Sequence, residues 1–336
     1  MARPKKKLNI LLIEPNYSNK YPPIGLMKIA SYHRSRGHNV VFYKGDLRAF
    51  VIERILRTLH QNCTKMRLKQ LKFSICLLLV CLLLQGCDMF EAHPYDAQVR
   101  GETGINARSA SRIAQQTEGK DTIRFAFISD TQRWYDETKK AVSDINRRQD
   151  IDFVIHGGDL SDFGATHELE MQRDILLRLR QPWVALLGNH DCLGTGESVH
   201  QRIFGPSNSY FIAGRVLFVC LNTNCMEYDY SEPVPDFGFL EHVITSVPDS
   251  IMHTVVAMPV PPFDLEFHNT VARVFQAYLH QLPGLLCCIY GHGHRYAVDD
   301  LFDDGILYLQ TPCIDKRGYL VFTLTPDGYE HQLVAF

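Results

Sequence analysis

Four short polar motifs, each following closely on an apolar run, constrain the fold of this chain more than any other feature of its sequence. The runs are predicted strands, because each is short, apolar and bounded by turn residues. The pairs of strand and motif are 123–128 with Asp-Thr-Gln at 130–132, 153–155 with Gly-Gly-Asp at 157–159, 184–187 with Gly-Asn-His-Asp at 188–191, and 285–290 with Gly-His-Gly-His at 291–294. Each motif therefore follows the carboxyl end of a strand.

Amphipathic segments separate the first three strands, and residues 137–148 and 168–179 are predicted helices. Strands that alternate with helices at intervals of about 30 residues predict βαβ units, an α/β fold and a mainly parallel sheet. Ligands bind at the carboxyl ends of the strands in such sheets. We therefore expect the four motifs to meet at one site.

The residue types in these motifs are typical of a site with two metal ions. Carboxylate, imidazole and amide oxygen donors suit Mn²⁺, Fe or Zn²⁺ without any thiolate. A carboxylate between two ions neutralises their charge and fixes their separation at roughly 3.5–4 Å, which suits in-line attack on phosphorus by an ionised water. One motif alone would be weak evidence, because an Asp after a strand is often a helix cap and a buried His is often a core residue.

The motif set D-x-Q, GGD, GNHD and GHGH resembles the calcineurin-like metallophosphoesterases, whose usual motifs are DxH, GD, GNH followed by Asp or Glu, a single His, and GHxH. The resemblance covers residues 122–336. It implies a β-sandwich of two mixed sheets flanked by helices, with the late strands 306–310, 319–325 and 329–334 in the second sheet. It also implies hydrolysis of a phosphomonoester or phosphodiester substrate by a metal-bound hydroxide.

The same resemblance implies which residues hold the two divalent ions. The first ion would be held by residues from three of the motifs, namely Asp130, Gln132, Asp159 and His294. Asp159 would bridge to the second ion, to which Asn189 and His292 would also bind.

Three further residues receive roles beside the ions. His190 would protonate the leaving oxygen or stabilise charge on the phosphoryl group. Asp191 would orient His190 through its carboxylate. Asp162 would either form a hydrogen bond within the Gly-Gly-Asp turn or, as we favour, cap the helix that follows.

Two positions depart from the family pattern. Gln132 stands where His is most common, but its amide oxygen can still coordinate a hard ion. Pro259 stands at the end of the predicted strand 254–258, where relatives have a His that binds the second ion, and proline has no side-chain donor. We therefore expect the second ion to bind with lower affinity and the rate of hydrolysis to be lower. His253 and His268 are candidate substitutes, of which His268 is better placed because His253 begins the strand.

An export signal is predicted in the interior of the chain. Residues 66–87 read MRLKQLKFSICLLLVCLLLQGC, with three basic residues before an apolar run of twelve, 73–84. This length suits a signal sequence better than a membrane-spanning helix, which needs roughly 20 apolar residues. The end of the segment, 84–87, resembles the lipobox of bacterial lipoproteins, which makes Cys87 the candidate lipid anchor. A short buried helix or an uncleaved anchor are the alternatives.

Residues 88–121 are polar without an apolar period, which predicts a linker between that anchor and a metallophosphoesterase domain at 122–336. If the signal beginning at Met66 is used, the protein is expected to be lipid-anchored in a bacterial cell envelope. Otherwise it is expected in the cytoplasm.

The first 65 residues read as the start of another fold, with a strand at 8–13, a helix at 25–36 and a strand at 39–43. This βαβ unit resembles the opening of the cobalamin-binding domain of certain radical SAM enzymes. The DxHxxG and CxxxCxxC motifs of those enzymes are absent, so no cofactor is expected here. We interpret 1–65 as a partial, non-functional fragment before an original start at Met66, with an additional interaction domain as the alternative.

The amino-acid composition bears on which classes of function are expected. With 35 basic and 37 acidic residues the net charge is −2, so no nucleic-acid-binding surface is expected. Cys220 and Cys225 could form a disulfide in an oxidising compartment, although buried free thiols are the simpler expectation. A metal-dependent phosphoesterase is the leading hypothesis. The alternatives are a degenerate phosphoesterase-like lipoprotein that binds a ligand or partner with little hydrolysis, and a cobalamin or radical enzyme.

Overall fold

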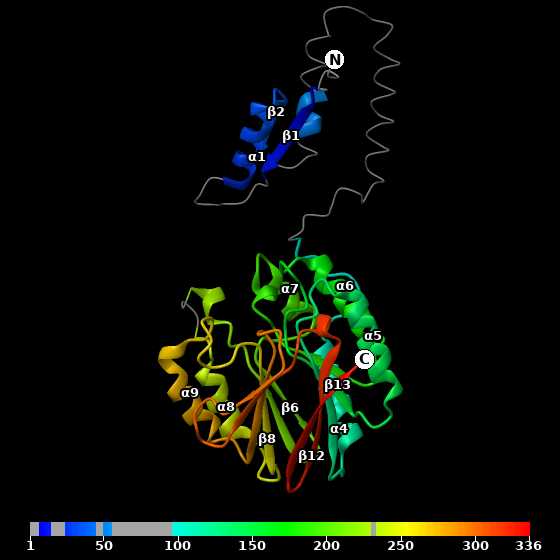
Figure 1. The fold of residues 1–336 in the computed structure, drawn as a ribbon, viewed down its shortest axis with the longest axis vertical. Coiled ribbons are helices and arrows are strands. Elements are labelled where there is room, and N and C mark those ends of the chain that lie inside the picture. Colours follow the sequence, from blue (N-terminus) through cyan, green and yellow to red (C-terminus); the bar gives the residue numbers. More distant parts are fainter. Residues whose placement is uncertain (1–6, 15–23, 45–49, 56–95, 230–232) are drawn as a thin grey trace, which may run out of the picture. The chain divides into compact units, whose positions relative to one another are not determined.

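The computed structural model describes residues 7–14, 24–44, 50–55, 96–229 and 233–336 (Figure 1). The chain divides into two units, Met1–Glu91 and Ala92–Phe336. The predicted signal segment 66–87, its Cys87 and the first residues of the predicted linker lie outside the described residues. In the parts of the chain that are described, no helix combines the length and the apolar character needed to cross a membrane.

The first unit contains the strand–helix–strand arrangement expected from its sequence. Strand β1 (Asn9–Glu14) pairs in parallel with β2 (Asn39–Lys44), and helix α1 (Ile24–Ser35) connects them. Residues 50–55 are also helical. Parallel neighbours require such a crossover, because a tight turn cannot join them.

The second unit is a sandwich of two mixed sheets flanked by helices, which confirms the predicted fold class. One sheet has the order β13-β12-β3-β4-β5 and the other β10-β11-β9-β8-β7-β6. The strands are β3 (Ile123–Ile128), β4 (Phe153–His156), β5 (Trp183–Ala185), β6 (Ser209–Ala213), β7 (Val216–Cys220), β8 (His253–Met258), β9 (Leu285–Tyr290), β10 (Ala297–Asp299), β11 (Leu307–Gln310), β12 (Gly318–Thr325) and β13 (Gly328–Ala335). In the six-stranded sheet β11, β9, β8 and β7 run in parallel, and the edge strands β10 and β6 are antiparallel to their neighbours. In the five-stranded sheet β3, β4 and β5 run in parallel, and the antiparallel pair β12 and β13 is joined to β3 through β12.

The continuous apolar runs of the central strands are explained by burial on both faces. In β3, Phe125 and Phe127 face the interior between the sheets, whereas Ala126 and Ile128 face the helices. The Phe125 ring stacks on the ring of Phe153 with centroids 5.3 Å apart and meets Phe218 of the other sheet edge-to-face at 5.2 Å. This aromatic cluster fixes how the two sheets pack.

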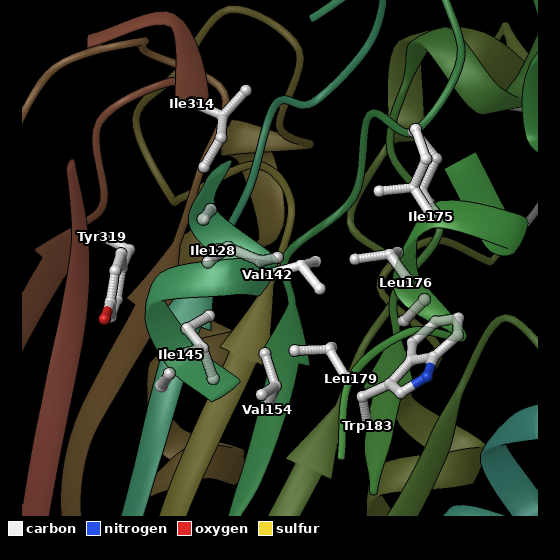
Figure 2. Close-up of a cluster of buried hydrophobic side chains, with 14 of the residues drawn as sticks. Ile128, Val142, Ile145, Val154, Ile175, Leu176, Leu179, Trp183, Ile314 and Tyr319 are labelled. Carbon is white, nitrogen blue, oxygen red and sulfur yellow. The ribbon is translucent and has the colours of Figure 1, made fainter. Parts of the chain in front are cut away.

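Helices cover the outer faces of the sandwich. The helices α5 (Tyr135–Arg147) and α6 (Thr166–Leu176) bury apolar side chains against β3, β4 and β5 (Figure 2), and α7 (Gly196–Ile203) adds Val199 and Ile203 to the same cluster. The helices α8 (Phe237–Ser246) and α9 (Ala272–Leu279) cover the six-stranded sheet. The motifs lie just after the carboxyl ends of β3, β4, β5 and β9.

Part of the predicted linker is instead folded, and this is a correction. Residues 105–117 form helix α4 (Ile105–Thr117), which packs against β5 and β6. Its buried side chains at 105, 109, 113 and 117 follow the helical i, i+4 spacing, but only two of them are isoleucines. Asn106 completes the contact, because its amide exchanges hydrogen bonds of 2.8 and 2.9 Å with the backbone of Ala185. The folded unit therefore extends well before residue 122.

The placement of the last two strands also differs from the prediction. Strand β11 lies in the six-stranded sheet, as expected for the second sheet. Strands β12 and β13 instead return to the first sheet, where β12 pairs antiparallel with β3. The alternating pattern of a hairpin fits either sheet, and the aromatic pair Phe125 and Phe322, stacked at 4.9 Å, shows which contact is made.

Candidate metal centre

The motif residues after β3, β4 and β9 turn sharply out of the sheets. Asp130, Asp159, His292 and His294 all have positive φ values, between 55° and 66°. This left-handed conformation costs roughly 1–2 kcal/mol for a non-glycine residue and persists where the surroundings impose it. Such strained residues gather at functional sites, and here four of them carry candidate metal ligands.

Two glycines allow the second and third motifs to touch backbone to backbone. Gly158 has φ of 109°, and a Cβ there would lie 2.8 Å from the Cα of Gly188. A Cβ on Gly188 would lie 2.1 Å from both the backbone nitrogen and Oδ1 of Asp159. Any larger residue would displace Asp159, so these glycines position the carboxylate.

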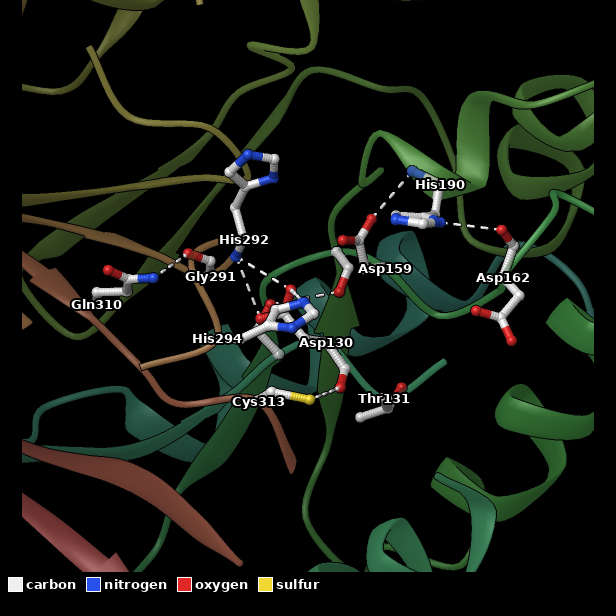
Figure 3. A network of polar contacts seen from close by, with 12 residues as sticks. Asp130, Thr131, Asp159, Asp162, His190, Gly291, His292, His294, Gln310 and Cys313 are labelled. Carbon is white, nitrogen blue, oxygen red and sulfur yellow. Dashed lines mark hydrogen bonds and ion pairs between the residues drawn. The ribbon is translucent and has the colours of Figure 1, made fainter. Parts of the chain in front are cut away.

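Three of the predicted ligands of the first ion lie together. The donor atoms of Asp130, Asp159 and His294 are all within 4.8 Å of one another, and His294 Nε2 lies 3.5 Å from Asp130 Oδ1 (Figure 3). Gln132 is buried nearby in the chain, and its backbone N–H donates to the carbonyl of Asp159 at 3.1 Å. Its Oε1 is buried without a hydrogen-bond partner among the described residues, which is costly unless a hydrogen-bond donor or a cation binds this oxygen.

The electrostatics of this group suit a cation. Burial, followed by the nearby carboxylates of Asp130 and Asp191, raises the pKa of Asp159 well above its usual value. A hydrogen bond with Asp130 raises the pKa of His294. Two buried carboxylates with one imidazole beside them form a donor set that a divalent ion neutralises, so the residues present fit a metal.

Asp130 is held by groups that no motif indicated. Its carboxylate accepts the backbone N–H of His292 at 3.0 and 3.2 Å, and its backbone carbonyl accepts the Cys313 thiol at 3.0 Å (Figure 3). Burial raises the pKa of Cys313 to about 12, so the thiol keeps its proton and can donate. Cys313 lies after β11, and no motif in the sequence predicted that it would contact Asp130.

His190 has a different partner from the one expected. Its Nδ1 lies 2.9 Å from the backbone carbonyl of Asp162, and its backbone N–H donates to Asp159 Oδ1 at 3.1 Å. Because a carbonyl only accepts, Nδ1 must carry a proton, which leaves Nε2 as the nitrogen that can exchange one with a substrate. The His190 ring is therefore oriented by the backbone at Asp162 and not by Asp191.

The buried carboxylate of Asp191 serves as an anchor, which corrects its predicted role. It accepts hydrogen bonds of 2.8 to 3.2 Å from Leu160 N, Ser161 N, Ser161 Oγ and Gly188 N. These bonds tie the loop after β4 to the loop after β5. Asp191 thus fixes the relative position of the second and third motifs.

Asp162 does not cap the following helix, so the favoured interpretation is wrong. Its two carboxylate oxygens share the single Nε–H of Arg133, each at 2.9 Å from Nε, and Nη2 of the same guanidinium donates to Oδ1. The turn before α6 is satisfied by Glu168, which accepts from Phe163 N at 3.0 Å. The Arg133–Asp162 pair joins the loops after β3 and β4 and was missed because Arg133 belongs to no motif.

The predicted second site is less complete than the first. The ring of His292 points away from Asp130 and lies outside the three-residue group, with Nε2 3.5 Å from Asp264 Oδ1 (Figure 3). Asn189 has a buried Oδ1 without a partner in the described parts of the chain. Pro259 is buried directly after β8, where it supplies no donor.

Of the two histidines proposed as substitutes for Pro259, His253 lies too far from the motifs. His253 begins β8, and its Nε2 lies 2.9 Å from the carbonyl of Pro326, at the opposite end of the strand from the motifs. His268 is the residue before the short helix η4 (Asn269–Val271) and, like His292, lies outside the group of Asp130, Asp159 and His294.

A buried histidine beneath the site was also missed, and it yields a prediction. His156 Nδ1 accepts the backbone N–H of Gly158 at 3.2 Å, and Nε2 lies 2.9 Å from Thr131 Oγ1. Burial lowers the pKa of His156 to about 3. Since the unfolded chain has the higher pKa, near 6.5, it takes up the proton first, and the free energy of unfolding falls as pH drops from about 6.5 towards 3.

Replacement of His156 by Gln removes this titrating group, so the free energy of unfolding should depend less steeply on pH. The slope is expected to fall by up to roughly 1.4 kcal/mol per pH unit, which corresponds to one proton. The measurement is urea unfolding in EDTA at pH 7, 6 and 5. His242→Gln, at an exposed position of α8, is the matched control and should retain the parent slope. An unchanged slope in His156→Gln would show that His156 is already protonated in the folded state.

The sandwich and its donor group together define an α/β domain equipped to bind divalent cations at its strand ends. The chain belongs to the calcineurin-like phosphoesterase family, whose model matches residues 123–296 and so spans all four motifs. A comparison with curated proteins found no match.

Solved structures with a similar fold include phosphatases. A dimetal phosphatase from Danio rerio is 12% identical, with 64% of this chain and 99% of that chain covered and a TM-score of 0.49. The protein GAP50, the anchor in the inner membrane complex of Plasmodium, is 12% identical over 64% of this chain and 85% of that chain, with a TM-score of 0.48. A purple acid phosphatase from seeds of yellow lupin (Lupinus luteus) is 13% identical over 65% of this chain and 55% of that chain, with a TM-score of 0.48.

Proposed function

We propose that this metal-dependent phosphoesterase hydrolyses phosphomonoesters or phosphodiesters with two divalent ions, held by Asp130, Gln132, Asp159 and His294 and by Asp159, Asn189 and His292. The observation that carries the proposal is the group of Asp130, Asp159 and His294, whose donor atoms lie within 4.8 Å of one another in a family of phosphoesterases. Mn, Fe and Zn all suit these oxygen and nitrogen donors.

The ions, when bound, supply a nucleophile by ionising water near neutral pH and neutralise charge on the phosphoryl group. The chain supplies the remaining chemistry. His190 protonates the leaving oxygen from Nε2, while the Asp162 carbonyl holds the other ring nitrogen. Asp191 keeps the His190 loop at a fixed distance from Asp159 through its backbone hydrogen bonds.

The test is hydrolysis of aryl phosphate monoesters and diesters by the full chain, with Mn²⁺, Fe²⁺ or Zn²⁺ and with EDTA. Turnover that depends on the metal and ceases in EDTA is expected, and the ratio of monoester to diester rates defines the substrate class. Metal binding without turnover of either ester would favour the alternative of a degenerate phosphoesterase that binds a ligand, for which Pro259 is the motivating feature.

Replacement of His190 by Gln is expected to slow substrates according to their leaving group. The rate of hydrolysis of phenyl phosphate, which has a poor leaving group, should fall about 100-fold or more. The rate for p-nitrophenyl phosphate should fall at most about tenfold, because its leaving oxygen needs little protonation. His167→Gln, an exposed histidine on α6, is the control. Equal losses on both esters would contradict the role of His190 as proton donor.

We also propose that residues 66–87 are a lipoprotein-type signal with Cys87 as the lipid anchor, that 1–65 is a non-functional fragment, and that the protein lies in a bacterial cell envelope. The basic start, the apolar run and the 84–87 motif support this. Because Ala97 already packs on the core, the tether from Cys87 would be about nine residues, or roughly 30 Å when extended. Incorporation of labelled palmitate in a bacterial host should occur in the parent and be lost in Cys87→Ser.

A further inference from the structure

The second ion site lacks a ligand at Pro259, and another side chain occupies the space beside His292. We propose that Asp264 supplies the ligand that Pro259 lacks and binds the second ion beside His292. This inference rests on the proposed two-metal function.

The distance between Asp264 and His292 suits two ligands of one ion. Asp264 Oδ1 lies 3.5 Å from His292 Nε2. Donors bound to a common ion at about 2.1 Å are separated by about 3.0 Å in an octahedral site and about 3.4 Å in a tetrahedral site. The two side chains are 34% and 18% exposed, so the pair is accessible to an ion from solution.

The orientation of His292 supports the same assignment. Its backbone N–H donates to Asp130, but its ring points away from Asp130 (Figure 3), and the ring Nε2 lies 3.5 Å from Asp264 Oδ1. A second ion bound by this ring would therefore lie on the side of His292 where Asp264 supplies an oxygen.

The loop that carries Asp264 is held in place before any ion binds. Val260 exchanges hydrogen bonds of 3.0 and 2.7 Å with the side chain of Thr223, which fixes the chain just after Pro259. The Asn269 side chain then donates to the Asp264 carbonyl at 2.6 Å, and the Glu266 N–H donates to Asp264 Oδ1 at 3.0 Å. Oδ2 accepts no hydrogen bond from the described residues, so it can bind an ion without breaking the turn.

Unbalanced negative charge continues beyond Asp264. Glu266 has a buried Oε2 without a partner in the described part of the chain. Burial, together with the charge of Glu266, raises the pKa of Glu227, and His190 acts in the opposite direction. The surroundings of His190 and the loop after β8 thus favour an additional cation.

The test is the number and arrangement of bound Mn²⁺ ions, measured by isothermal titration calorimetry and electron paramagnetic resonance on the full chain. The parent is expected to bind two ions and to show the signal of an exchange-coupled pair. Asp264→Asn keeps an oxygen for the Glu266 N–H but removes the charge. This variant is expected to bind the second ion with an affinity at least about tenfold lower. Its spectrum should show mainly the six-line signal of a single Mn²⁺ ion.

A carboxylate in a comparable turn provides the control. Asp300 is exposed and accepts the N–H groups of Asp304 and Gly305 at 3.1 and 2.9 Å, as Asp264 accepts that of Glu266. Asp300→Asn should retain both ions. Unfolding temperatures in EDTA should be alike in parent and Asp264→Asn, which shows that the loop is intact.

The outcomes separate this inference from the function on which it rests. If Asp264→Asn still binds two coupled ions with unchanged affinity, Asp264 is not a metal ligand and only stabilises its turn. The proposed function would not be affected by that result. A parent that binds one ion at all Mn²⁺ concentrations would overturn the inference. A parent that binds no ion would overturn the proposed function itself.

Discussion

Replacement of Asp159 by Asn is expected to abolish hydrolysis, with a loss of at least about a thousandfold, and to abolish binding of the ion pair. Asp159 is the carboxylate proposed to bridge both ions, and a neutral amide cannot balance their charge. A thousandfold loss corresponds to about 4 kcal/mol of transition-state stabilisation. The rate of aryl phosphate hydrolysis and Mn²⁺ titration by calorimetry measure the two effects.

The same variant should be no less stable than the parent when metal is removed. The folded-state pKa of Asp159 is raised above its unfolded value, so above the unfolded pKa the carboxylate opposes folding. Asn removes that cost and retains an oxygen for the His190 N–H. We therefore expect an equal or higher unfolding temperature in EDTA, and no further rise when Mn²⁺ is added.

Asp136→Asn, which changes an exposed carboxylate paired with Lys139 on α5, is the matched control and should behave like the parent. Retained ion binding with lost activity in Asp159→Asn would place the ions on other ligands. A lower unfolding temperature in EDTA would mean that Asp159 is a structural anchor.

The strands and the first metal ligands were predictable because several local signals agreed. Strands β3 and β9 begin and end where the apolar runs do, since both faces of these strands are buried and polar turn residues follow them directly. The glycines of the motifs indicated turns that bring Asp130 and Asp159 together. In this region local sequence and tertiary contacts require the same residues.

Features that depend on distant contacts were not predictable in the same way. Helix α4 buries Ser109 and Thr117 as well as its two isoleucines, so its apolar stripe is too faint to distinguish from a polar linker. The choice of sheet for β12 and β13 depends on aromatic contacts with β3 and not on the hairpin pattern itself.

In the site, two of the missed residues contact the backbone of a motif. Cys313 donates to the carbonyl of Asp130, and His156 accepts the N–H of Gly158. Cys313 is far from Asp130 in the sequence, and His156, although next to the Gly-Gly-Asp motif, belongs to none of the motif patterns. Asp264 was missed for a related reason, because only the fold shows that it lies next to the side chain of His292.

Replacement of Asp191 by Ala is expected to lower the free energy of unfolding by about 3 to 5 kcal/mol. The fully buried carboxylate accepts from three backbone N–H groups and one hydroxyl, and alanine would leave those donors buried without partners. Urea unfolding in EDTA measures the loss. Glu241→Ala, an exposed carboxylate on α8, should change stability by no more than about 0.5 kcal/mol.

Asp191→Asn separates an anchor from a group that acts on His190. Asn keeps one accepting oxygen for Leu160 and Ser161 but turns an amide group towards the Gly188 N–H, so stability should fall by roughly 1 to 3 kcal/mol. If Asp191 only anchors the loops, His190 still bonds to the Asp162 carbonyl in the molecules that remain folded. The ratio of the phenyl phosphate rate to the p-nitrophenyl phosphate rate should then be close to that of the parent. If Asp191 tunes His190 directly, that ratio falls as it does in His190→Gln while stability is little changed. The first result would confirm that the aspartate of the Gly-Asn-His-Asp motif holds the second and third motifs together.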